Sequence, residues 1–249
     1  MIIFVRISPL ADYNRSNGMF QIKRRLEDAS GLPCLVLNLS EATPKIIEDV
    51  RPRAIVLSGS GTWFQDMPAR DFDVFEESLN TRPEIPRIGF CASHQLTAFS
   101  FNTGLRRMDK VMDQCMRPLH HGEPDLSGGG AHGLGMFSEK GFLPVQIMQR
   151  DPLFEGLPDE LIICQTHFCE VKKLPDEFEL LASGAQCKIQ AMKHKTRILY
   201  GTQFHPECWI PAFPHGRKIL ENFFRIAGID LSPEARLIPR LTDYVPPPF

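Results

Sequence analysis

The chain has 249 residues, of which 43% are apolar, and a formal net charge of −2. This length allows one large or two small domains, and one α/β domain of this size can bury a sizeable core. The balanced charge and the lack of a long basic run argue against nucleic-acid binding. No apolar run is long enough to span a bilayer, so we expect no membrane partner.

Seven cysteines at irregular spacing argue against a disulfide framework and indicate a reducing compartment, so we expect a cytoplasmic protein. No C-x-x-C pair indicates a zinc site, and we expect neither a metal nor a cofactor. Residues 1–7 are apolar, but the segment is short and contains Arg6, which favours a first strand over a signal peptide.

The first half of the chain alternates apolar strands with helices. The patterns predict strands at 2–7, 34–39 and 54–57, and helices at 19–29, 43–50 and 71–79. Continuously apolar strands that alternate with helices indicate a parallel sheet covered on both faces. We therefore expect an α/β fold, a flavodoxin-like three-layer sandwich with a mainly parallel central sheet and added antiparallel strands.

The second half is less regular. Residues 105–112 are compatible with a strand, and 114–138 form a long irregular stretch whose three histidines match no familiar metal-ligand spacing. We expect this stretch to be a lid or a partner-docking insert. Later patterns predict a strand at 161–164, antiparallel strands at 178–182, 188–192 and 198–204, and a closing amphipathic helix at 215–227. The expected organisation is one domain over 1–230 and a Pro-rich tail over 231–249.

Cys91 lies where a predicted strand, ending at Phe90, meets a predicted helix that begins with Ala92. A nucleophile on such a turn projects from the sheet, and small neighbours such as Gly89 and Ser93 allow the tight backbone. The helix N-terminus also favours a thiolate. The sequence therefore predicts a nucleophile at Cys91; the alternative is a buried structural cysteine.

His205, Pro206 and Glu207 follow a predicted strand near the other end of the chain. Pro206 disfavours helical backbone at His205, so we expect an extended tripeptide in which His205 and Glu207 point to the same side. Glu207 can then bind one ring nitrogen of His205 while the other nitrogen faces the Cys91 thiol. Nucleophile, base and orienting group would form a Cys-His-Glu arrangement for covalent catalysis.

These two segments resemble the motifs of the class I glutamine amidotransferases. The glutaminase domains of that family carry a G-x-C-x-G-x-Q elbow and a Q-F-H-P-E segment, which correspond here to Gly89–Gln95 and Gln203–Glu207. The second motif matches completely, whereas Ser93 stands where the family usually has glycine. The resemblance covers residues from about 1 to about 228 and implies that Cys91, His205 and Glu207 form a catalytic triad.

The loop from Ser58 to Gly61 resembles the family's S-G-G-P loop. Amide hydrolysis passes through an oxyanion, which pre-aimed backbone N–H groups stabilise. We expect one such donor at Ala92, just after the nucleophile, and the resemblance implies a second at Ser60. The alternative is a Gly-rich turn that binds nothing. The resemblance also implies which residues hold the substrate, namely Gly59, Gln95, Phe168 and Cys169.

Three functions remain open from the sequence. The first is a glutaminase that cuts the glutamine side-chain amide through a Cys91 thioester and supplies ammonia to a separate synthase subunit. The second is a stand-alone γ-glutamyl peptidase or hydrolase on the same scaffold, acting on larger γ-glutamyl amides. The third is a non-catalytic regulatory relative, against which an intact Cys91, His205 and Glu207 argue. His167 is either a polar residue at the pocket edge or a core histidine with a satisfied hydrogen bond.

Overall fold

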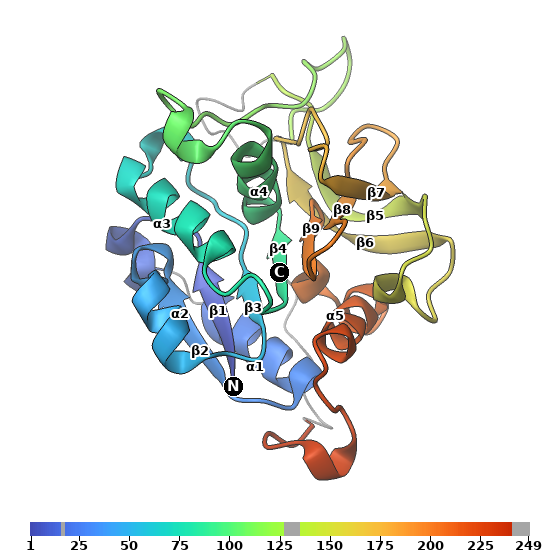
Figure 1. Cartoon of the computed structure of the whole chain (residues 1–249). Helices are drawn as coiled ribbons and strands as arrows, with labels where there is room; N and C mark the ends of the chain where they lie inside the picture. Colours follow the sequence, from blue (N-terminus) through green and yellow to red (C-terminus); the bar gives the residue numbers. More distant parts are fainter. Residues whose placement is uncertain (16–17, 127–134, 241–249) are drawn as a thin grey trace.

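The computed structural model of the chain describes residues 1–15, 18–126 and 135–240 (Figure 1). In these ranges a nine-stranded sheet is covered by helices on both faces. The strands are β1 Ile2–Arg6, β2 Cys34–Asn38, β3 Ile55–Leu57, β4 Arg87–Phe90, β5 Glu139–Ile147, β6 Glu160–His167, β7 Phe178–Ser183, β8 Ala191–His194 and β9 Leu199–Thr202. The α-helices are α1 Gly18–Ser30, α2 Pro44–Val50, α3 Ala69–Asn80, α4 Ala92–Asn102 and α5 His215–Ile226.

The sheet has a parallel half and an antiparallel half, in the strand order β2-β1-β3-β4-β9-β8-β7-β5-β6. Strands β2, β1, β3, β4 and β9 pair in parallel with one another. Counted along the chain, these five strands have the order 2-1-3-4-5 that defines flavodoxin-like sheets. Strands β8, β7, β5 and β6 extend the sheet with antiparallel pairs. The expected fold class is confirmed.

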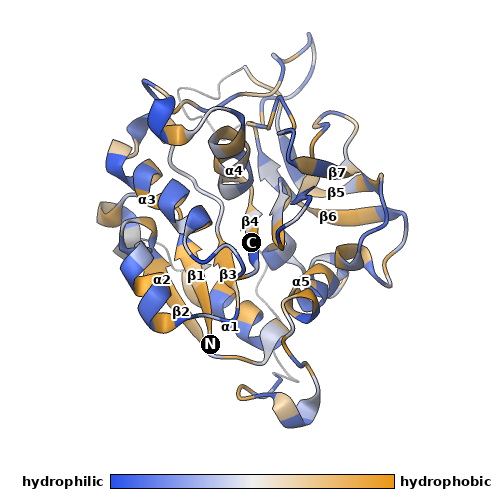
Figure 2. Cartoon of the chain, in the orientation of Figure 1, coloured by the Kyte–Doolittle hydropathy of each residue, from blue (hydrophilic) through white to orange (hydrophobic). Residues whose placement is uncertain are grey.

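Two apolar cores lie between the sheet and its helical layers. One packs α1 and α5 through residues such as Leu26 and Phe223, and the other packs α2, α3 and α4 through residues such as Ile47, Phe75 and Leu96. Figure 2 shows strands β1 and β3 in hydrophobic colours, while much of the outer surface of α2 and α3 is hydrophilic. Strands buried on both faces explain the continuous apolar runs of the sequence. None of the helices in the described ranges is long and apolar enough to cross a bilayer.

The antiparallel half departs from the expectations in several elements. Residues 105–112 contain no strand, and Leu105–Arg107 is a 3-10 helix. The Leu105 N–H donates to the Glu76 carboxylate at 3.0 Å and not to the carbonyl of a neighbouring strand. Strand β5 lies outside the predicted elements, because Gly141 and Pro144 are residues that normally interrupt strands. Strand β8 begins at Ala191 and not at the expected residue 188. Its pairing with β7 changes register between Leu180 and Ala182. Strand β9, predicted as antiparallel, also pairs in parallel with β4.

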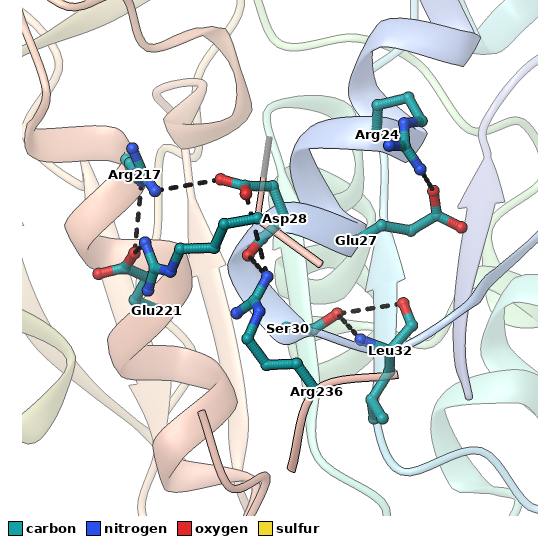
Figure 3. Close-up of polar contacts among 9 residues, drawn as sticks. Arg24, Glu27, Asp28, Ser30, Leu32, Arg217, Glu221 and Arg236 are labelled. Atoms are coloured by element: carbon teal, nitrogen blue, oxygen red, sulfur yellow. Dashed lines mark hydrogen bonds and ion pairs between the residues drawn. The ribbon is translucent and has the colours of Figure 1, made fainter. Parts of the chain in front are cut away.

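The segment after α5 packs on the end of α1, as Figure 3 shows. Arg236 is 4% exposed in its side chain and donates a hydrogen bond to the Asp28 carbonyl at 2.6 Å. The N–H groups of Leu237 and Ile238 donate to the carbonyl of Gly31 at 2.9 and 3.0 Å. A Cβ at Gly31 would lie 2.9 Å from Arg236 Cγ, so glycine permits this close packing. The domain boundary expected at residue 230 stays a prediction, and residues 241–249 of the expected tail lie outside the described ranges.

Arg236→Ala is expected to lower the free energy of unfolding by about 1–3 kcal/mol, because Asp28 loses a charged hydrogen-bonding partner inside the protein. Urea titration followed by circular dichroism measures this loss. Arg240→Ala is the matched control, since the Arg240 side chain is 43% exposed and pairs with Glu221 at 3.2 Å. Its effect is expected to stay within about 0.5 kcal/mol. A loss for Arg236→Ala within about 0.5 kcal/mol would show that the contact between Arg236 and Asp28 adds no stability to the domain.

Candidate active site

Cys91 occupies the sharp turn between β4 and α4. Its backbone has φ 48° and ψ −103°, a conformation that L-residues rarely adopt and that costs about 1–3 kcal/mol. The surrounding strands hold this turn, because the Cys91 N–H donates to the Thr202 carbonyl of β9 at 2.7 Å. The structure therefore places Cys91 on the strand-to-helix elbow that the sequence predicts, with 7% of the residue exposed.

Ser93 fits the elbow because Gly89, which packs against it, has no side chain. A Cβ added at Gly89 would lie 2.9 Å from the Ser93 Cβ, so the missing side chain of Gly89 leaves room for serine. The Ser93 hydroxyl donates to the carbonyl of Ser58 at 2.5 Å. This hydrogen bond joins the elbow to the Ser58–Gly61 loop at the end of β3, which glycine at position 93 would not do.

His205 and Glu207 follow the end of β9 and approach the elbow from its neighbouring strand. His205 Nδ1 and Glu207 Oε1 are 2.8 Å apart, and both residues are buried. The tripeptide is not extended as expected: Pro206–Cys208 forms a 3-10 turn. This turn still brings the Glu207 carboxylate back onto the imidazole, because Pro206 is compatible with the first position of a helical turn.

The charge balance around His205 favours the imidazolium form. Burial of the ring disfavours its charged form, but the Glu207 carboxylate and the Cys91 thiol outweigh burial, so the pKa of His205 lies well above its usual value. The other ring nitrogen, Nε2, is buried and has no hydrogen-bond partner among the described residues. The ring therefore carries a proton that it can give to a leaving group.

Gly59 is the residue of the Ser58–Gly61 loop that lies against the side chains of Cys91 and His205. A Cβ at this position would lie 2.8 Å from His205 Cε1 and 3.3 Å from Cys91 Cβ. The backbone of the Ser58–Gly61 loop therefore approaches the thiol and the imidazole as closely as a glycine allows. Such an approach is needed if backbone N–H groups are to reach an oxyanion formed at Cys91.

A cavity of about 370 Å³ opens onto the Cys91 thiol at the carboxyl ends of the parallel strands. All nine residues predicted for the site line this cavity: Cys91, His205, Glu207, Ser60, Ala92, Gly59, Gln95, Phe168 and Cys169. Trp63 and Phe168 form an aromatic pair on the wall, with ring centroids 4.8 Å apart. The structure therefore brings together residues that lie up to 148 positions apart, from Gly59 to Glu207.

Two further residues support the site and were not singled out from the sequence. Gln203 donates from Nε2 to Cys91 Sγ at 3.5 Å and accepts from Gln95 Nε2 at 3.2 Å, which links both glutamines to the sulfur. Arg25, on α1, donates to the Glu207 carbonyl and lies over the Trp209 ring, 5.4 Å from its centroid. Gln203 belongs to the recognised Q-F-H-P-E motif, whereas no sequence signal connects Arg25 to Glu207.

A thiol, an imidazole and a carboxylate at the carboxyl edge of a flavodoxin-like sheet form the arrangement that cysteine-dependent amide hydrolases use. A family model, glutamine amidotransferase class-I, matches residues 17–227. A glutamine-hydrolyzing GMP synthase subunit from Pyrococcus furiosus is 31% identical over 73% of this chain and 79% of that protein. The corresponding GMP synthase subunit from Archaeoglobus fulgidus is 35% identical over 73% of this chain and 84% of that protein.

The fold agrees with solved structures. A putative GMP synthase subunit from Thermoplasma acidophilum superposes with a TM-score of 0.67 at 24% identity, covering 92% of this chain and 94% of that one. The chain therefore belongs to the class-I glutamine amidotransferase family and is an enzyme of that family. The family expected from the two motifs is confirmed.

Gly59→Ala is expected to lower kcat by about 10²-fold or more while leaving the fold intact, because the added methyl group would push His205 away from Cys91. Gly61→Ala is the matched control, since a Cβ there has nothing within 4 Å in the described structure. Steady-state ammonia release measures both variants, and a thermal melt checks folding. Equal activities of the two variants would contradict the close approach of the loop to the thiol–imidazole pair.

Proposed function

We propose that this enzyme hydrolyses the side-chain amide of glutamine through a γ-glutamyl thioester on Cys91, with His205 as proton carrier and Glu207 as its orienting partner. The single observation that carries the proposal is the convergence of Cys91, His205 and Glu207 on one cavity from the adjacent parallel strands β4 and β9. Family membership supplies glutamine as the substrate class.

The first step forms the thioester. The Cys91 thiolate attacks the carbonyl carbon of the amide, and the carbonyl π electrons move onto oxygen. His205 then gives its Nε2 proton to the amide nitrogen, the C–N bond breaks, and ammonia leaves. The Glu207 carboxylate at Nδ1 holds the ring in the orientation and protonation state that this transfer requires.

The second step releases glutamate. A water molecule loses a proton to His205 Nε2 and attacks the thioester carbonyl, after which the C–S bond breaks and the Cys91 thiolate is restored. Both steps pass through an oxyanion. We propose the backbone N–H groups of Ala92 and Ser60 as its donors, since Ala92 is the first residue of α4 and its N–H has no partner within the helix.

Gln95, Phe168, Cys169 and Gly59 are the proposed substrate-binding residues. Gln95 is buried, and its Oε1 atom has no hydrogen-bond partner among the described residues, although Nε2 is bonded to Gln203. A free amide oxygen beside the cavity is suited to accept from the α-ammonium group of glutamine. Phe168 and Cys169 also line the cavity, and their backbone is proposed to bind the same end of the substrate.

We propose that the ammonia is used by a separate synthase subunit. Relatives from Pyrococcus furiosus and Archaeoglobus fulgidus are each named as one subunit of a glutamine-hydrolyzing GMP synthase, which supports an assembly of at least two different chains. We also propose that the protein is located in the cytoplasm. All seven cysteines are free, as expected for a protein in a reducing compartment.

A glutamine-like electrophile is expected to label Cys91 alone and to abolish ammonia release from glutamine, with no labelling of Cys91→Ala. Five thiols outside the proposed substrate site are internal controls: Cys34, Cys115, Cys164, Cys187 and Cys208. Burial raises the pKa of Cys34 to about 12, which keeps that thiol unreactive. Cys164 is the demanding control, because a hydrogen bond with Cys208 lowers its pKa.

Peptide mapping by mass spectrometry locates the label, and the same preparation is assayed with free glutamine and with γ-glutamyl dipeptides. The proposal requires a higher kcat/KM for glutamine. Persistent labelling of Cys91→Ala would remove Cys91 from the reaction, and a preference for dipeptides would identify a γ-glutamyl peptidase instead.

Glu207→Gln is expected to lower kcat on the order of 10²-fold, because the amide cannot stabilise the imidazolium of His205. The variant should also move the alkaline limb of the kcat/KM profile to lower pH. The sign follows from the carboxylate, which raises the pKa of His205 against the effect of burial, so its removal lets the ring lose its proton earlier as pH rises. Glu155→Gln, on an exposed side chain, is the control. An unchanged profile with an unchanged thermal melt would place Glu207 outside the reaction.

A further inference from the structure

Four buried side chains close a hydrogen-bonded ring behind the cavity wall. Gln190 Nε2 donates to Glu139 Oε2 at 2.7 Å, and Gln165 Nε2 donates to Gln190 Oε1 at 3.1 Å. His167 Nε2 completes the ring, 3.1 Å from Gln165 Oε1 and 3.0 Å from Glu139 Oε2. None of the four residues is more than 7% exposed, so water does not compete for these contacts.

The carboxylate of Glu139 fixes the direction of every hydrogen bond in this ring. An ionised carboxylate only accepts, so the amide nitrogen of Gln190 must face it. The Gln190 oxygen then accepts from the Gln165 nitrogen, which leaves the Gln165 oxygen facing His167 Nε2. His167 Nε2 therefore lies against two acceptor oxygens and must carry a hydrogen. Moving that proton to Glu139 would leave the Gln165 oxygen against a bare nitrogen lone pair.

The second ring nitrogen of His167 also faces an acceptor. Nδ1 lies 3.0 Å from the carbonyl oxygen of Cys169, which offers only lone pairs. Both nitrogens face oxygen acceptors, an arrangement that an imidazolium with two N–H groups would satisfy and that a Glu139 carboxylate would balance in charge. Pairing and full hydrogen bonding are the conditions under which a protein interior tolerates such charges.

We propose that the His167 imidazolium, held by Glu139, is a positioning residue that fixes the substrate-binding backbone at Phe168 and Cys169. The inference rests on the proposed glutaminase function and adds the device that places one wall of its substrate site. His167 Nδ1 holds the Cys169 carbonyl from the inside. On the outside, the Phe168 carbonyl accepts from the Met116 N–H at 2.8 Å, so the segment is anchored on both sides.

The ring is also connected to the nucleophile. The Gln190 carbonyl accepts from the Gln203 N–H at 2.8 Å, and the Gln203 side chain donates to Cys91 Sγ at 3.5 Å. One rigid buried network thus supports the wall that binds the amino-acid end of glutamine and the residue that contacts the sulfur. Loss of the ion pair is expected to weaken substrate binding more than turnover, since Cys91, His205 and Glu207 keep their own contacts.

The protonation state is tested without substrate. Nitrogen-15 NMR of the wild-type enzyme, labelled at histidine, is recorded at about pH 8, where an ordinary histidine is neutral. Both ring nitrogens of His167, assigned by comparison with His167→Gln, should show the shifts of an imidazolium. A single protonated nitrogen would overturn the proposal, as would a stoichiometric metal ion found by elemental analysis, because Glu139, His167 and Cys187 lie close enough to hold one.

The positioning role is tested by kinetics. Glu139→Gln should raise the KM for glutamine about tenfold while kcat changes by less than about threefold. Glu160→Gln is the matched control, since Glu160 lies at the exposed start of the same strand β6 that carries His167, and should leave both constants unchanged. If kcat falls as much as KM rises, or if neither changes, the wall is not positioned by this pair. An inactive wild-type enzyme with an imidazolium at His167 would refute the glutaminase proposal but not the ion pair.

Discussion

The strained backbone of Cys91 is the constraint on which the rest of the site depends. A residue with φ 48° at the end of a buried strand persists only if its neighbours fix it. Strand β9 does so through the Thr202 carbonyl, and the loop after β3 does so through the Ser58 carbonyl and the Ser93 hydroxyl. Because β3, β4 and β9 are adjacent and parallel, their carboxyl ends meet, and the same three strands deliver the loop, the thiol and the imidazole.

The carboxylates and histidines around this elbow are buried, where an unpaired charge is costly. Glu207 orients His205 and is itself approached by Arg25 from α1. A second buried carboxylate, Glu139, contacts His167 in the ring with Gln190 and Gln165 behind the cavity wall at Phe168 and Cys169. In each case a carboxylate inside the protein pairs with a histidine, because a low-dielectric interior makes an unpaired charge costly.

Much of the fold and the whole proposed triad could be predicted from the sequence because their signals are local. Continuous apolar runs identify the parallel strands, and the turn at Cys91 is visible in Gly89 and Ser93. Strand β5 could not be predicted, since Gly141 and Pro144 hide a segment that is stabilised by its long pairing with β6. The contacts of Arg25 with Glu207 and of Glu139 with His167 were equally invisible. They join residues that are far apart in the chain and depend on how the helices and strands pack.

The central claim is that Cys91 carries the γ-glutamyl group during turnover. The most direct measurement is rapid acid quenching of the enzyme during steady-state glutamine hydrolysis, followed by mass spectrometry of the intact protein and of its peptides. The account predicts a γ-glutamyl adduct on the peptide that contains Cys91, formed and lost at rates compatible with turnover. Active enzyme that never carries this adduct, or that carries it on another residue, would contradict the account.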